Sequence, residues 1–179
     1  MAPLLITVVL LLLLLIAAVA DTRKHRIPNV ISLAGWILAP LLHALAFGTE
    51  GFFSSLLALA VTLVLTFPLY ALHWMGAGDV KLMVSVGAFL GDIQSALLAL
   101  LFIVITGALF SLAIHLYKTS LSATLARLRA MISLSLSMRR PVYVPPGDAT
   151  ATLLIPYAVP IALGTLLFLF YARWEIPGF

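Results

Sequence analysis

From Pro3 to Ala20 the chain runs without one charged side chain, and similar apolar runs recur along most of its length. A helix needs roughly 20 apolar residues to cross the hydrocarbon core of a bilayer. Hydrophobic residues make up 64% of the chain and charged residues only 9%, against about 25% in soluble domains. Because so little polar surface cannot cover a water-facing globule, we predict an all-α, polytopic membrane helix bundle.

Six stretches of the chain are candidates for membrane spans, and together they make residues 1–179 a single membrane-embedded domain. The fourth stretch is only about half a span, so we expect neighbouring helices to shield it. The second stretch contains Pro40, where we expect a break. The candidates are residues 3–20, 30–47, 52–74, 80–90, 93–117 and 151–171.

The basic residues indicate the direction in which the chain crosses the membrane. With both termini outside, every Lys and Arg except Arg173 falls on the cytoplasmic side, as the positive-inside rule requires. The end of the first run, Ala18-Val19-Ala20, fits a signal-peptide cleavage pattern. However, no basic residue precedes the run, and it is longer than a signal core. We therefore expect it to remain as a membrane helix.

The longest loop, residues 118–149, is basic and is predicted to be cytoplasmic. Leu121, Leu125, Leu128 and Ile132 recur in it at helical spacing. This pattern predicts a short amphipathic helix that lies on the inner membrane surface.

Two aspartates stand at predicted membrane boundaries. Asp21 ends the first apolar run, and Asp79 follows the third run in Gly76-Ala77-Gly78-Asp79. The predicted orientation puts both at one depth, on the cytoplasmic side, where ionisable groups usually face a cleft or the protein interior. Two carboxyl groups that share a site cannot both ionise easily, so one keeps its proton while the other can activate water. Such a pair titrates as a unit, and the sequence assigns neither role to either residue.

The residues around Asp79 allow two interpretations. Gly76 and Gly78 permit unusual backbone angles and the close approach of an extended substrate, or they form a tight cytoplasmic turn. Lys81 either tunes the pKa of Asp79 or anchors the chain on the inner side. Taken alone, Asp21 would more readily be a helix-end cap among solvated charges.

Three segments, taken together, resemble the type IV prepilin peptidases. Asp21 followed by Ile27-Pro28-Asn29 resembles that family's first signature, and Gly76-Ala77-Gly78-Asp79-Val80-Lys81-Leu82 resembles its second. The segment Ile155-Pro156-Tyr157 is similar to the one that opens the family's last helix. The resemblance implies that Asp21 and Asp79 are the catalytic pair of an aspartic endopeptidase that needs no cofactor and no metal. It further implies substrate-binding or structural roles for Pro28, Asn29, Gly76, Gly78 and Lys81.

The resemblance also implies a substrate and a location. The enzyme would cut the basic leader from type IV prepilins or prepilin-like proteins at the cytoplasmic face of the bacterial inner membrane, in contact with membrane lipid. The short chain is most similar to the peptidases of tight-adherence pilus systems. Longer members carry a cysteine-bearing region and also N-methylate the product. Since this chain has no cysteine, methyltransferase activity is not predicted.

Other functions have less support in the sequence. The Tyr-Asp and Pro-Ala-Leu segments of presenilin-type proteases are absent, as is the His-Glu-x-x-His motif of metalloproteases. No basic patch is interleaved with aromatic residues, so nucleic acid is not an expected partner. The alternative that stays open is a non-enzymatic transporter or pilus-assembly scaffold. A transporter would favour ionisable groups near the middle of its spans, whereas most of them here lie at the ends.

Overall fold

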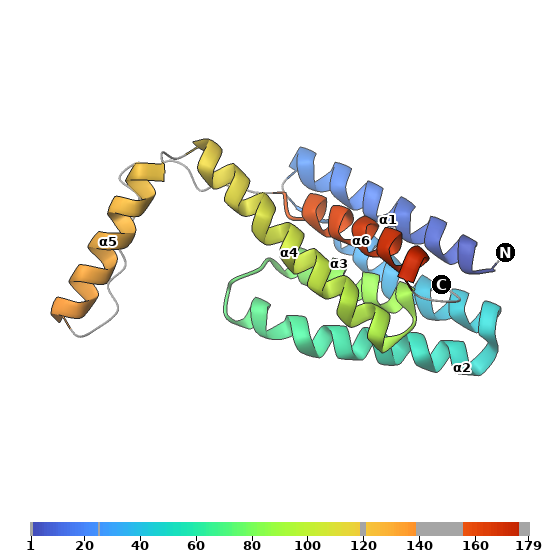
Figure 1. Ribbon diagram of the computed structural model, residues 1–179. Helices are drawn as coiled ribbons and strands as arrows, with labels where there is room; N and C mark the ends of the chain where they lie inside the picture. The colour runs from blue at the N-terminus through green and yellow to red at the C-terminus, as the bar shows by residue number, and fades with distance from the viewer. Residues whose placement is uncertain (1, 25, 119–120, 139–155, 176–179) are drawn as a thin grey trace. The chain divides into compact units, whose positions relative to one another are not determined.

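The computed structural model describes residues 2–24, 26–118, 121–138 and 156–175, and it is almost entirely helical over these ranges. No strand occurs in the described part of the chain, so the predicted all-α class is confirmed. The helices are α1 (Ala2–Lys24), α2 (Asn29–Ala71), α3 (Ala77–Leu90), α4 (Ile93–Lys118), α5 (Leu121–Met138) and α6 (Ala158–Glu175), labelled in Figure 1.

Two compact units divide the chain after Ala108. The first unit holds α1, α2, α3, α6 and the beginning of α4. The second holds the rest of α4 and α5. Helix α5 lies within the loop that the sequence marks as basic, and residues 139–149 of that loop are outside the described residues.

Three helices of the described chain are long and apolar enough to cross a membrane: Pro3–Lys24, Asn29–Ala71 and Ile93–Ile114. With 43 residues, α2 would be about 65 Å long if it were straight, twice the hydrocarbon thickness. It is not straight, because Gly48 has φ 70° and ψ −153° and leaves the helical region. The chain reverses at this point, so it runs in opposite directions through the two arms of α2 (Figure 1). The two arms of α2 therefore correspond to the two separate membrane spans that the sequence predicts over residues 30–47 and 52–74.

The expectation that Pro40 breaks the second span is wrong. Helix α2 continues through Pro40 and Pro68, and its non-helical backbone lies at Gly48. The φ of proline is compatible with a helix, and what it removes is one backbone hydrogen bond. An apolar environment retains the other hydrogen bonds of the helix, because there is no water to replace them.

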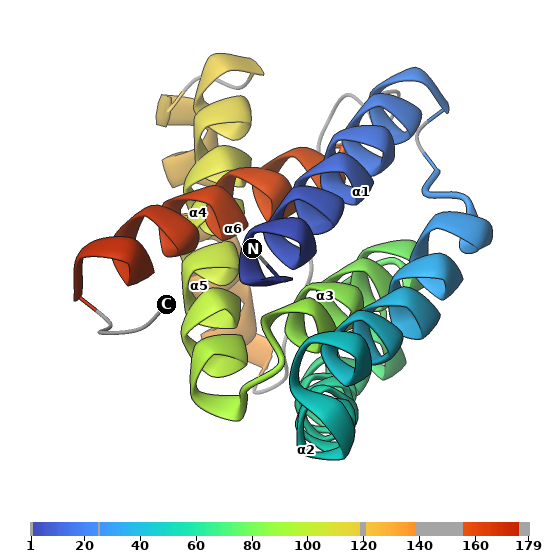
Figure 2. The ribbon, with the colours of Figure 1, turned by 90° about the vertical axis from the view of Figure 1, so that its right-hand side faces the viewer.

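Helix α3 has 14 residues, too few to cross a bilayer alone, and it packs along α2 (Figure 2). Every residue from Leu82 to Phe89 is buried, as expected for a short helix shielded by its neighbours. Small residues allow the two helices to approach closely. A Cβ on Gly87 would collide with Thr62, and a Cβ on Gly35 would lie 2.7 Å from Ser85.

The remaining core of the first unit joins α1, α6 and the beginning of α4. Helix α1 packs against α6 and α2, and Leu10 and Leu14 are almost completely buried. Phe102 of α4 packs edge-on against Phe168 of α6. The sixth predicted span began at residue 151, but α6 begins at Ala158, and residues 151–155 lie outside the described part of the chain.

Candidate active site

Asp21 lies in the last turn of α1 and is buried, with 5% of its surface exposed. Its Oδ2 accepts a hydrogen bond of 2.9 Å from the backbone N–H of Ala158, the first residue of α6. The first N–H groups of a helix have no partner within that helix. Asp21 therefore does act as a cap, but it caps α6 and not the helix on which it stands.

Asp79 lies in the first turn of α3, outside the membrane-spanning helices. The pKa of Asp79 is raised from its ordinary value of 3.8 to about 6. Burial is the largest cause and the negative charge of Asp21 the second, while a hydrogen bond with the Gly76 backbone acts in the opposite direction. The two aspartates are thus close enough for the charge of one to change the pKa of the other.

The reversal of α2 is what brings the two carboxyl groups to the same end of the helices. Helix α1 ends at Asp21, the first arm of α2 leads away, and the second arm returns after Gly48. Helix α3 then begins next to the end of α1, with which it is in contact. This path brings both aspartates to one end of the helices, and their common depth in a membrane stays a prediction.

The segment after α1 contacts the segment around Asp79. The Lys81 ammonium donates a 3.0 Å hydrogen bond to Oδ1 of Asn29. Gly78 packs against Ile27, so closely that an added Cβ would lie 3.2 Å from the Cβ of Ile27. Pro28 precedes α2 with extended backbone angles, φ −60° and ψ 133°. The structure thus brings the two signature segments together.

The expectation of unusual backbone angles at the two glycines needs correction. Neither Gly76 nor Gly78 has a positive φ, and Gly76 has the ordinary angles φ −68° and ψ 148°. The space beside them is taken by the chain itself, because an added Cβ on Gly76 would lie 2.9 Å from Oδ2 of Asp79. The Lys81 ammonium donates to Asn29, and its effect on the pKa of Asp79 stays a prediction.

Three groups at this site were not found from the sequence. They are the backbone N–H of Ala158, the side chain of Ile27, and Trp36, whose indole Nε1 donates to the carbonyl of Lys81 at 3.0 Å. A backbone donor has no side-chain signature, so only the resemblance at Ile155-Pro156-Tyr157 pointed to the start of α6. An indole in an apolar helix looks like any other core residue.

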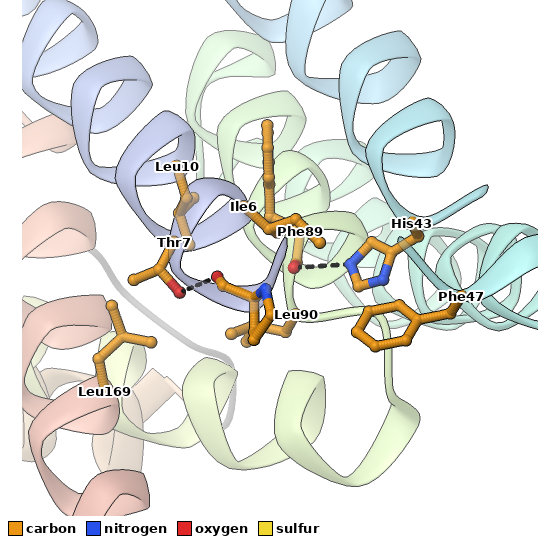
Figure 3. Close-up of a pocket in the computed structure, with 9 residues that line it drawn as sticks. Ile6, Thr7, Leu10, His43, Phe47, Phe89, Leu90 and Leu169 are labelled. Carbon is orange, nitrogen blue, oxygen red and sulfur yellow. Dashed lines mark hydrogen bonds between the residues drawn. The ribbon is translucent and has the colours of Figure 1, made fainter. Parts of the chain in front are cut away.

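A cavity of about 180 Å³ lies in another part of the first unit (Figure 3). Its lining includes Ile6 at the start of α1, Leu90 at the end of α3, and His43, whose Nε2 is 3.0 Å from the carbonyl oxygen of Phe89. Along α3, Leu90 and Asp79 are separated by about 16 Å, given the 1.5 Å rise per residue. The cavity is therefore not part of the carboxylate site. Among the described residues, no group of three His, Cys, Asp or Glu side chains could hold a metal ion.

Comparison with known proteins shows the family to which the chain belongs. The family model described as the type IV leader peptidase family matches residues 8–112. The chain belongs to the type IV leader peptidase family. The match includes both aspartates of this leader peptidase and both signature segments around them. Helix α6, whose first residue bonds to Asp21, lies beyond the matched range. Neither the curated proteins nor the solved structures gave a match.

Proposed function

We propose that the chain is a membrane aspartic endopeptidase in which Asp21 and Asp79 form the catalytic pair. The observation that carries the proposal is the convergence of these two carboxyl groups. One is buried at the end of α1, and the other is next to it at the start of α3, with its pKa raised to about 6. A pair in which one member holds a proton near pH 6 has the properties required for acid–base hydrolysis of a peptide bond.

The reaction consumes one water molecule. The ionised carboxylate takes a proton from water while the water oxygen bonds to the peptide carbonyl carbon, and the protonated carboxyl group gives its proton to the carbonyl oxygen. Collapse of this tetrahedral intermediate breaks the C–N bond. The leaving nitrogen takes the proton that the first carboxylate accepted from water, and a hydroxyl proton of the intermediate returns to the other carboxylate, so the pair regains its one-proton state.

The proposed substrates are type IV prepilins or prepilin-like proteins, cut after their basic leader at the cytoplasmic face of the bacterial inner membrane. Such a substrate has an apolar helix after its leader. A helix standing in the bilayer beside the enzyme would place the leader junction at the depth of Asp21 and Asp79, so the membrane would supply much of the positioning. The tight-adherence pilins are the subclass we propose. N-methylation is not part of the proposal.

The supporting residues keep the pair in place. Lys81 and Asn29 join the start of α3 to the start of α2, and Gly78 lets the chain at Ile27 approach α3. Pro28 starts α2 in the required direction, and Gly76 leaves room for the Asp79 carboxyl group. We propose structural roles for all five motif positions.

The test is cleavage of a co-expressed prepilin by the variants Asp21→Asn and Asp79→Asn, read from the mass of the mature pilin N-terminus. Each variant is expected to lose activity by roughly 10²- to 10⁴-fold, because each removes a group that must exchange a proton. The matched control is Asp92→Asn. Asp92 caps the start of α4, where its Oδ2 accepts the Ser95 N–H at 2.8 Å, and asparagine caps a helix equally well.

Two results would count against the proposal. One is wild-type processing by either variant at normal membrane abundance. The other is the absence of prepilin processing with the wild-type chain, as a transporter or scaffold would give.

A further inference from the structure

The connection between α2 and α3 leads directly to Asp79 and contains an uncommon backbone conformation (Figure 1). His73 has φ 59° and is the only residue of the described ranges, apart from glycines, with a positive φ. The N–H of His73 donates to the carbonyl of Tyr70, and the N–H of Trp74 donates to that of Leu69, both at 2.9 Å. These two bonds close the end of α2 in the manner of a Schellman motif. They hold the backbone of Trp74 in place.

The indole of Trp74 is the large group that this turn presents to its surroundings. Its side chain is 73% exposed, whereas the next residue, Met75, packs against the core of the first unit. The N–H of Met75 also donates to the carbonyl of Leu69, at 3.2 Å. The turn therefore sends one apolar side chain inward and leaves Trp74 outside, five residues before Asp79.

Helices α1 and α2 both end at this face, and their C-terminal ends differ in charge. The C-terminal end of a helix is the negative end of its dipole and favours a cation. Helix α1 has Arg23 and Lys24 in its last turn, whereas the last turn of α2 has no basic residue. Beyond the end of α2, His73 is exposed and the Lys81 ammonium donates to Asn29. The end of α2 can therefore accept a cation from outside the chain.

Carboxylates that could bind such a cation are scarce at this face. Outside the proposed pair, the acidic residues of the described chain fall at the opposite face in the predicted topology: Glu50, Asp92 and Glu175. Asp148 lies outside the described residues. The exposed residues that follow Asp21 are basic instead, and they repel a basic peptide: Arg23, Lys24 and Arg26. The face of an indole, by contrast, attracts a cation although it carries no net charge.

We propose, given the peptidase function above, that Trp74 and the C-terminal end of α2 bind a basic side chain of the substrate leader. A guanidinium or ammonium group lies over the indole face and near the negative end of the α2 dipole. An extended chain spans at most about 3.6 Å per residue, so the Cα of Trp74 is no more than about 18 Å from that of Asp79. An extended leader covers this distance in about five residues, which places the bound cation within about five residues before the cut.

The test is Trp74→Ala, with cleavage measured on two peptides that share a glycine and an apolar segment and differ in the leader. One leader contains arginine, and the other contains its neutral isostere citrulline. Nanodiscs of phosphatidylcholine are used, because headgroups without net charge do not compete for the leader. Loss of the indole is expected to raise KM for the arginine peptide about two- to fivefold, as for an exposed cation–π contact. The kcat should stay unchanged, because the contact is the same before and during the reaction.

Trp174→Ala is the matched control. Trp174 is 74% exposed but stands in the last turn of α6, at the far end of that helix from the bond between Ala158 and Asp21. Its loss should leave KM for both peptides at the wild-type value. Trp74→Phe keeps an aromatic face and is expected to retain part of the preference for the arginine peptide.

Two kinetic results would overturn the proposal. One is an unchanged KM for the arginine peptide in Trp74→Ala. The other is an equal rise of KM for the arginine and citrulline peptides, which would make Trp74 an anchor at the membrane interface, where tryptophan is enriched.

A binding measurement separates this proposal from the peptidase function. The Kd of the labelled arginine peptide is measured by fluorescence anisotropy on the Asp79→Asn variant, which is not expected to cut it. Site-specific fluorination of the Trp74 ring weakens the negative potential of its face with little change of shape, so the Kd should rise with each added fluorine. A Kd that is independent of fluorination, or equal for the arginine and citrulline peptides, overturns the proposal. If the wild-type chain cuts neither peptide, the peptidase function is rejected, and the fluorination series still decides whether Trp74 binds the leader.

Discussion

At the scale of single residues, Asp79 links the site to the stability of the protein. Its carboxyl group has a pKa of about 6 in the folded state and an ordinary value of 3.8. Between these values the folded chain binds a proton that the unfolded chain has lost. The free energy of unfolding therefore falls as the pH rises through this window. Above pH 6 the full penalty is present, about 3 kcal/mol for a shift of this size.

Asp79→Asn is accordingly expected to raise the thermal unfolding temperature above pH 6, although it abolishes the proposed activity. Its advantage should shrink as the pH falls through this window and disappear below pH 3.8, where the wild-type carboxyl group becomes protonated in both states. Thermal unfolding of both proteins in detergent, measured at these two pH values, checks the sign. A variant that is no more stable than the wild type above pH 6 would show that burial and the charge of Asp21 do not destabilise ionised Asp79 in the folded protein.

The residue scale also shows what a sequence can predict about such a site. Asp21 and Asp79 were identified because a carboxylate at the end of an apolar run is conspicuous. The partner of Asp21 was not identified, because any residue at position 158 except proline would offer the same N–H. What fills the space beside the glycines has no sequence signature either. A sequence shows that space is available beside Gly78, but not that Ile27 fills it.

At the scale of helices, the apolar runs predicted the elements well, since length and hydropathy determine what can cross a membrane. The boundaries depended on single backbone angles, which hydropathy does not report. The sequence predicts two helical stretches here, residues 30–47 and 52–74, and the structure places them in two arms of α2. The turn between the arms is a single residue, Gly48, and the backbone is helical on both sides of it. Pro40 looked like the stronger break because proline lacks an N–H.

Gly48→Ala is therefore expected to weaken the turn within α2. No atom lies within 4 Å of an added Cβ at this position, so the cost is that of backbone strain alone. At φ 70° and ψ −153° that strain is about 1–3 kcal/mol for a residue other than glycine. Thermal unfolding in detergent measures it.

Gly107→Ala in α4 is the matched control. Its added methyl group also meets open space, but its backbone is helical, so alanine should be neutral or stabilising by up to about 1 kcal/mol. Equal effects of the two variants would mean that the positive φ of Gly48 is not required for the reversal of α2.

At the scale of the whole molecule, the distribution of charge along the chain bears on which membrane face carries the site. Cleavage of a basic leader at the cytoplasmic face requires Asp21 and Asp79 to lie at that face. The charge distribution predicts this orientation, because nine of the ten Lys and Arg residues fall at their end of the predicted spans, five of them in the loop of residues 118–149. Glu50 and Gln94, both exposed, would then lie at the opposite face.

The absence of native cysteine makes single-cysteine labelling the direct test of this topology. Glu50→Cys and Gln94→Cys are expected to react with an impermeant maleimide added to intact spheroplasts. Trp74→Cys, in the exposed connection before α3, and Ser137→Cys, in α5, should react only after lysis. The Ser137 variant also tests whether α5 lies on the cytoplasmic side. Labelling of Trp74→Cys from outside would put the aspartates at the outer face, where a leader retained in the cytoplasm could not reach them.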